Sequence, residues 1–295
     1  MSRAIRHHIV PRFFLRRFAD DQRMLLVRNL KEGREFEASP KRVAYELDYY
    51  TVDTAAGPSD AIEQALSKGE SLAAQALREI DAGAFPPSEQ ARGAISSFMA
   101  MQFVRGQDFR DMGDRAATGA MRMMGQVAAS QPDYVRRVLP KALGREVTDD
   151  EVQGVIAGLE KADVTVKVAR EQHIETMLHV ANEAFPFFVK RKWFLVEGKD
   201  FPTTDMPVVL WQRPRGGFFG QGVGVMTADE IAMAIGPTRA LVLVHPDEIT
   251  GGNSGAERRV TFSKETEEQL RLRIWQNALR YQFRHPSSPA PNGAR

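Results

Sequence analysis

The hydrophobic periodicity of the chain changes at Pro186, and this change constrains the fold more than any other feature of the sequence. Before Pro186, apolar residues recur at helical spacing over long stretches. After it, short apolar runs are separated by glycine and proline, as is typical of strands. These runs lie at 193–196, 207–211, 222–226, 231–235, 240–244 and 259–262. A helical middle region followed by a mostly antiparallel sheet predicts the α+β class.

Helix boundaries are marked by capping residues and by glycine. The spacing predicts a helix that begins behind Asp60 and ends at Gly83, and a second helix that begins near Ser88. The Met-rich stretch 116–129 has helical composition. Thr148 and Glu151 match a capping box, and the helical run that follows is expected to break or bend near Asp163 and to last until about Ala184.

The ends of the chain differ in character from its middle. The stretches 24–28 and 33–36 are typical of a short hairpin. A last helix is expected over 263–284, with Ser263 as its cap. The remaining residues, 285–295, are rich in proline, serine and glycine, which predicts a disordered tail. The expected organisation is a single domain over 1–284, helix-rich over 1–185 and strand-rich over 186–262.

The composition excludes several classes of protein. The 295 residues are 43% hydrophobic and 26% charged, which fits a globular chain with a sizeable core. The formal charge of +2 shows no whole-chain signature of a nucleic-acid or membrane-surface protein. With no cysteine, disulfides, thiolate metal sites and cysteine nucleophiles are excluded. Without a signal-like or long apolar segment, we expect a cytoplasmic protein with no membrane span.

The positive charge is concentrated at the N-terminus. The first eighteen residues hold five arginines and no acid, and Arg12, Arg16 and Arg17 are interleaved with phenylalanines. Such a segment could contact phosphates through its arginines while its aromatic rings stack. Alternatively, the phenylalanines pack into the core and the arginines pair with helix acids such as Glu63 and Glu70.

His7 and His8 lie within this basic segment. One interpretation places one imidazole in the core and the other in water; the alternative gives His8 a functional role. A histidine followed by apolar residues and proline is similar to the opening of HNH nucleases. The next histidine is His173, however, so the metal-ligand spacing of those enzymes is missing.

Two predicted helices carry polar residues at suggestive positions. Glu63 and Glu70 are seven residues apart, on one helix face and about 10 Å apart along the axis, so they serve either as solvated acids or as ligands joined by other elements. Gln102 shares an apolar stripe with Phe98, and Arg105 falls on the same face. A buried amide must find partners, in a structural network or in a site. Asn277 raises the same question in the last helix.

A loop between two prolines presents Asp205. A rigid loop suits a general base or a metal ligand, and it equally suits an Asx turn that satisfies its own backbone. The glycines at 216, 217, 220, 222 and 224 match neither a dinucleotide-binding nor a P-loop motif and favour a hairpin.

Together, these segments resemble the bacterial domain-of-unknown-function family numbered 4238. The segments are HHIVPRFFLRRF at 7–18, IEQALSKGE at 62–70, FMAMQFVRG at 98–106, FPTTDMPVVLW at 201–211, AMAIGPTRALVLV at 232–244 and IWQNALRYQF at 274–283. The family often has asparagine where this chain has Met206. The resemblance implies that the motif cores contain His8, Glu63, Gln102, Arg105, Asp205 and Asn277. It implies no established activity.

Two hypotheses follow. In the first, the protein is a hydrolase acting on a phosphodiester or nucleic acid, through a catalytic cleft formed by His8, Glu63, Gln102, Arg105 and Asp205. Asp205 or Glu63 would act as general base or as ligand to a divalent metal such as Mg²⁺, and Arg105 would stabilise a developing anion. In the second, the same polar residues form a structural network, and the protein is a non-catalytic binding or regulatory protein whose basic aromatic N-terminal arm engages nucleic acid or a phosphate-containing ligand. Its binding residues would be Arg12, Arg16, Arg17 and Asn277.

Overall fold

The computed structural model describes residues 6–54, 57–59, 61–161, 164–214, 223–248 and 256–293. The hairpin expected from the glycines between 215 and 222 lies outside these residues. Where the sequence predicts one domain, the chain forms two compact units. The first comprises Met1–Gly106 and Ile174–Arg295, and the second comprises Gln107–His173.

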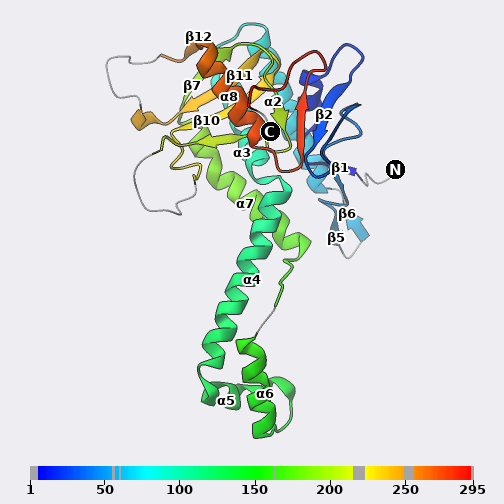
Figure 1. Ribbon diagram of the computed structural model, residues 1–295, viewed down its shortest axis with the longest axis vertical. Coiled ribbons are helices and arrows are strands. Elements are labelled where there is room, and N and C mark those ends of the chain that lie inside the picture. The colour runs from blue at the N-terminus through cyan, green and yellow to red at the C-terminus, as the bar shows by residue number, and fades with distance from the viewer. Residues whose placement is uncertain are drawn as a thin grey trace. The chain divides into compact units, whose positions relative to one another are not determined.

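The N-terminal part of the first unit is built from short strands and two long helices (Figure 1). The two-stranded sheets pair β1 with β4 and β5 with β6, all antiparallel. The elements are β1 (Arg6–His8), α1 (Arg12–Leu15), the 3₁₀ turn η1 (Arg16–Phe18), β2 (Leu25–Asn29), β3 (Arg34–Ala38), β4 (Tyr45–Leu47), β5 (Val52–Thr54), β6 (Gly57–Ser59), α2 (Ala61–Asp81) and α3 (Glu89–Val104). The predicted hairpin and the first two predicted helices are therefore confirmed.

A five-stranded sheet forms the core of the first unit. Its strand order is β12-β7-β11-β10-β9, and every pair is antiparallel except β12 with β7. The strands are β7 (Lys192–Glu197), β9 (Val209–Trp211), β10 (Glu230–Gly236), β11 (Arg239–Val244) and β12 (Arg258–Thr261). Both β10 and β11 are buried along almost their whole length, which explains why their sequences are continuously apolar. The strand predicted at 222–226 is not formed over its described residues, 223–226.

The second sheet joins the two ends of the chain. Its order is β3-β2-β13-β8, with β8 at Thr203–Thr204 and β13 at Tyr281–Arg284. Figure 1 shows β2 and β13 side by side, one near each end of the colour scale. Together with the helices, these sheets confirm the α+β class.

The last helix is shorter than the sequence predicts. Helix α8 (Lys264–Gln276) begins at the expected cap, where the Ser263 side chain accepts from the amide of Thr266, but it ends before Asn277. The prediction of a helix to residue 284 is wrong because Tyr281–Arg284 pairs as a strand between β2 and β8. Aromatic and polar side chains alternate over Tyr281–Arg284, a pattern that favours a strand over a further turn of helix.

Residues 285–293 pack against other parts of the first unit and do not form the predicted disordered tail. Ser288 is 4% exposed, and its hydroxyl donates to the Asp200 carboxylate over 2.6 Å. Arg271 donates to the carbonyl of Pro289. These partners lie far away in sequence, so composition alone could not reveal them.

The second unit is helical. It contains α4 (Gln107–Ala129), α5 (Pro132–Leu143), α6 (Asp149–Glu160) and the first residues of α7 (Arg170–Val189). The predicted capping box is present at the start of α6. A small core joins these helices and consists of Ala129, Val135, Val152 and Ile156. Asp163, where the helical run is expected to break, lies outside the described residues; α6 ends at Glu160, and α7 begins at Arg170 and continues through Pro186. None of the helices in the described part of the chain has both the length and the apolar character of a membrane span.

Candidate functional site

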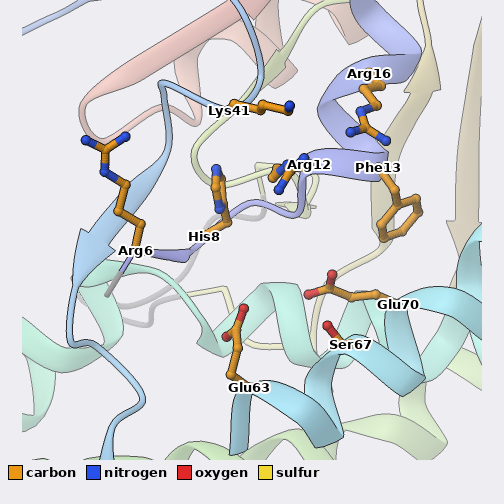
Figure 2. Close-up of a pocket in the computed structure, with 9 residues that line it drawn as sticks. All are labelled: Arg6, His8, Arg12, Phe13, Arg16, Lys41, Glu63, Ser67 and Glu70. Carbon is orange, nitrogen blue, oxygen red and sulfur yellow. The ribbon is translucent and has the colours of Figure 1, made fainter. Parts of the chain in front are cut away.

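A pocket of about 440 Å³ lies between the N-terminal segment and α2, a size typical of small-molecule sites. Figure 2 shows that cationic side chains reach it from the N-terminal segment and a neighbouring loop, whereas α2 contributes acids and a hydroxyl from the opposite side. The lining residues are Arg6, His8, Arg12, Phe13, Arg16, Lys41, Glu63, Ser67 and Glu70.

Burial of the neighbouring apolar residues positions the arginines. Phe14, Leu15 and Phe18 are fully buried, so the intervening positions of this short helical segment face outward. Phe14 packs against Phe98 of α3, with ring centroids 5.4 Å apart. The alternative that these aromatic residues belong to the core is therefore correct for Phe14 and Phe18. Phe13 is half-buried and lines the pocket.

Arg17 does not line this pocket. Its guanidinium forms two hydrogen bonds of 2.9 Å with the carboxylate of Asp81 and also donates to the carbonyl of Ile235. These contacts join the N-terminal segment to the end of α2 and to β10. Of the three arginines predicted to bind phosphate, Arg12 and Arg16 line the pocket and Arg17 does not.

The two adjacent histidines have different environments. His7 is fully buried, and its Nδ1 accepts a hydrogen bond of 2.7 Å from the amide of Tyr50. His8 is the next residue along β1 and lines the pocket (Figure 2). Because successive side chains of a strand point to opposite faces, a core position for His7 directs His8 to the pocket.

The imidazole of His8 is neutral at pH 7. Burial lowers its pKa to about 4, and the positive charges of Arg12 and Arg105 act in the same direction. The backbone of Pro40 and Lys41 opposes this shift only in part. Its Nε2 atom is buried and has no hydrogen-bond partner within the described residues. His8 therefore has an Nε2 atom without a hydrogen-bond partner among the described residues, near the positive charges of Arg12 and Arg105.

We expect the unfolding free energy of His8→Gln to fall less than that of the wild type when the pH is lowered from 7 to 5. The folded chain binds fewer protons than the unfolded chain between the ordinary pKa of 6.5 and about 4, so His8 costs stability as the pH falls through this window. Urea denaturation at pH 7 and pH 5 should show a smaller loss of unfolding free energy in His8→Gln than in the wild type. The exposed His179→Gln should retain the wild-type loss; an equal effect of both variants would contradict the assignment.

Behind the pocket, Arg105 forms a buried ion pair. Its side chain is 1% exposed; Nη1 donates to Glu70 Oε1 over 2.6 Å and Nε donates to the hydroxyl of Tyr50 over 3.0 Å. Burial would lower the pKa of Arg105, but Tyr50, Glu70 and Glu63 outweigh it and raise that pKa. Burial also raises the pKa of Tyr50 to about 12. Arg105 therefore remains a cation that holds Glu70.

The remaining charges make the pocket cationic. The side chains of Arg12, Arg16 and Lys41 form no ion pair with any residue that the structure describes. Glu70 is engaged by Arg105, and Glu63 is the second carboxylate that lines the pocket. Within the same described ranges, no three His, Cys, Asp or Glu side chains form a group that could hold a metal ion. Four cationic side chains thus face two carboxylates at this pocket.

Two of the five predicted catalytic residues, His8 and Glu63, line this pocket, and Arg105 lies next to it through Glu70. Gln102 is absent from its lining. Gln102 is 4% exposed, and neither its amide oxygen nor its amide nitrogen has a partner in the described part of the chain. The helical stripe correctly indicated that this amide is buried, but it does not contribute to the pocket.

Asp205 and Asn277 lie at another place, where they fasten the loop around Met206 to the chain after α8. The Asp205 carboxylate accepts from the amides of Leu279 and Arg280 over 3.0 and 2.8 Å. Asn277 Nδ2 donates to the carbonyls of Met206 and Val208 over 2.7 and 3.1 Å. Burial raises the pKa of Asp205 to about 6, against the effect of these amides. Neither residue lines the cationic pocket.

Sequence reasoning missed Lys41 and Ser67. Lys41 lies in a loop after Pro40, where nothing in the local pattern indicates a pocket. Ser67 could have been found, because it lies on the same face of α2 as Glu63 and Glu70.

Comparison with known proteins gives a family and no activity. No curated protein and no solved structure matches the chain significantly. A family described as a protein of unknown function, DUF4238, matches residues 6–288, which includes every residue of the pocket and of the loop around Asp205. Because this match covers nearly the whole chain, the chain belongs to the DUF4238 family.

Proposed function

We propose that the cationic pocket binds a phosphate group of a phosphodiester or nucleic acid. The observation that carries this proposal is that the pocket gathers four cationic side chains, and that Arg12, Arg16 and Lys41 among them have no ion-pair partner in the described residues. Guanidinium groups match the oxygens of phosphate in a bidentate geometry, and lysine adds a point charge.

The other lining residues suit the rest of such a ligand. Phe13 offers a half-buried ring on which a base could stack, as aromatic residues do in proteins that bind single strands. A volume of about 440 Å³ accommodates a nucleotide-sized group. The neutral His8 adds no charge in the free protein but could take up a proton when an anion lowers the local positive potential.

The proposal is tested with a fluorescein-labelled oligothymidylate, using fluorescence anisotropy, and with inorganic phosphate as competitor. We expect Arg12→Ala to weaken binding roughly 10- to 100-fold, since a hydrogen bond to a charged group contributes about 1.5–3 kcal/mol. Lys41→Ala should weaken it less and should reduce its salt dependence. Its matched control is the neighbouring Arg42→Ala, which removes an exposed cation outside the pocket.

The arms of this experiment separate the sources of the phosphate. Competition by inorganic phosphate at millimolar concentration indicates a site for one phosphate group, whereas oligonucleotide binding without competition indicates contact along the strand. Equal affinity of Arg12→Ala, Arg42→Ala and the wild type, or no binding that weakens with salt, would overturn the proposal.

Hydrolysis of the phosphodiester is the second candidate, and it is favoured by the unpartnered Nε2 of His8 in a pocket that Glu63 also lines. A neutral imidazole can accept a proton from water as the water oxygen bonds to phosphorus, and the resulting imidazolium can return that proton to the ester oxygen as its bond to phosphorus breaks. The same oligonucleotide, recovered after incubation and separated on a gel, shows this activity as shortened products that are absent with His8→Gln. An intact oligonucleotide with wild-type protein assigns the pocket to binding alone.

A further inference from the structure

A second cavity, of about 200 Å³, lies on another side of α2 within the first unit. Its walls come from α2, α3 and α7, and they are mainly apolar. The lining residues are Ile62, Ala65, Leu66, Gly69, Glu70, Ser97, Phe98, Met101, Arg105 and Leu178. On α2 the residues at 62, 65, 66 and 69 face this cavity, whereas Glu63 and Ser67 face the cationic pocket. The two pockets therefore use different faces of one helix and share only Glu70.

The cavity continues into an open groove of about 560 Å³. Ser97, Met101 and Leu178 line both spaces, so a ligand can reach the cavity along the groove. The groove exposes large apolar side chains to solvent, among them Leu72 at 55% and Leu178 at 38%. Burying such surface against an apolar chain is favourable because it removes apolar area from water.

Arg105, which lines the cavity, carries one donor without a partner among the described residues. Arg105 donates through Nε to Tyr50 and through Nη1 to Glu70, but its Nη2 is buried and makes no hydrogen bond within the described residues. A buried donor without a partner costs free energy, so a ligand that supplies an acceptor gains more than its apolar contacts alone.

The acceptor that fits is uncharged. Glu70 already balances the charge of Arg105 over 2.6 Å, and a second carboxylate would be repelled by Glu70 while losing its own hydration. A carbonyl oxygen accepts from Nη2 without either cost. We propose that this cavity binds an aliphatic molecule with a terminal, uncharged carbonyl group, whose oxygen accepts from Arg105 and whose chain lies along the groove between α2, α3 and α7.

The test is titration calorimetry of the full chain with 2-octanone, octanoate and octylammonium. These probes share a chain length and differ in the polar end. We expect 2-octanone to bind at least tenfold more tightly than either ion, because octanoate faces Glu70 and octylammonium faces Arg105 and offers no acceptor. Equal or tighter binding of octanoate would overturn the assignment of an uncharged acceptor.

Gly69 lines the cavity, so a larger residue there can block the cavity while Arg105 and its partners remain unchanged. A Cβ on Gly69 meets no atom within 4 Å, so Gly69→Phe adds a ring at the cavity without a backbone clash. Gly154→Phe on α6 is the matched control, because Gly154 is also an exposed helical glycine with open space around its Cβ. We expect Gly69→Phe to lose 2-octanone binding by at least tenfold and Gly154→Phe to keep it.

Two further readouts make the result unambiguous. Ala65 lines the same cavity one turn before Gly69 in α2, so Ala65→Phe should also lose 2-octanone binding. This variant tests the proposal if Gly69→Phe does not fold. Both variants should retain oligonucleotide binding, since neither residue lines the cationic pocket. Unchanged ketone affinity in a folded Gly69→Phe or Ala65→Phe, or no binding of 2-octanone to the wild type, would overturn the proposal.

Discussion

Glu70→Ala is expected to lower the free energy of unfolding by roughly 2–4 kcal/mol, because removing one partner of a buried ion pair strands the other charge. Arg105 is 1% exposed and would keep only the hydroxyl of Tyr50 among its present partners. Glu70 itself is 22% exposed, which places the expected loss below that of a fully buried pair. Equilibrium denaturation in urea, monitored by tryptophan fluorescence, measures the loss.

The double variant Glu70→Ala/Arg105→Met makes this prediction sharper. Replacing both members by apolar groups removes the stranded charge, so the double variant should be more stable than Glu70→Ala alone. Glu32→Ala is the control, since Glu32 pairs with Arg34 at the surface, where such pairs contribute about 0–1 kcal/mol. A loss in Glu70→Ala no larger than that in Glu32→Ala would show that the buried pair contributes little.

Asp205→Ala is expected to lower the unfolding free energy by roughly 2–3 kcal/mol, because two backbone amides that donate to the Asp205 carboxylate lose their acceptor. Those donors belong to Leu279 and Arg280, which connect α8 to β13. Without them the loop around Met206 is still held to this part of the chain by Asn277 and by the amide of Asp205, which donates to the carbonyl of Tyr281. The change should appear in urea denaturation as a lower midpoint with an unchanged slope.

Two comparisons separate a structural role of Asp205 from a functional one. Asp21→Ala removes an exposed carboxylate of the same kind and should leave stability unchanged within about 0.5 kcal/mol. Asp205→Ala should retain oligonucleotide binding at temperatures where it is folded, because Asp205 lies outside the cationic pocket. A stable Asp205→Ala variant that no longer binds the oligonucleotide would return Asp205 to the functional site.

Much of the fold follows from local spacing and could be predicted. The caps at Ser88, Thr148 and Ser263 are formed as expected, because each satisfies amides within the next three residues. The hairpin of β2 and β3 is likewise local. The end of α8 could not be predicted, since Tyr281–Arg284 becomes a strand only through β2, more than 250 positions earlier in the chain, and through β8.

The candidate site divides in the same way. The sequence indicated which polar residues are buried or aligned on a face, and His8, Glu63, Arg12 and Arg16 do line one pocket. It could not assign their partners. Asp205 is placed in a rigid loop as expected, but its oxygens are used by amides from the other end of the domain.

By itself, the sequence determined the α+β class, the caps, the basic N-terminal segment and a short list of polar side chains on apolar faces, such as Gln102. These properties depend on residues within a few positions of one another, whose spacing fixes which faces of a helix or strand are apolar. Only the tertiary structure decided which of those polar groups meet. Asp205 meets backbone amides and Arg105 meets Glu70, whereas Arg12 and His8 face an open pocket, because a hydrogen bond or an ion pair depends on distance in space and not along the chain.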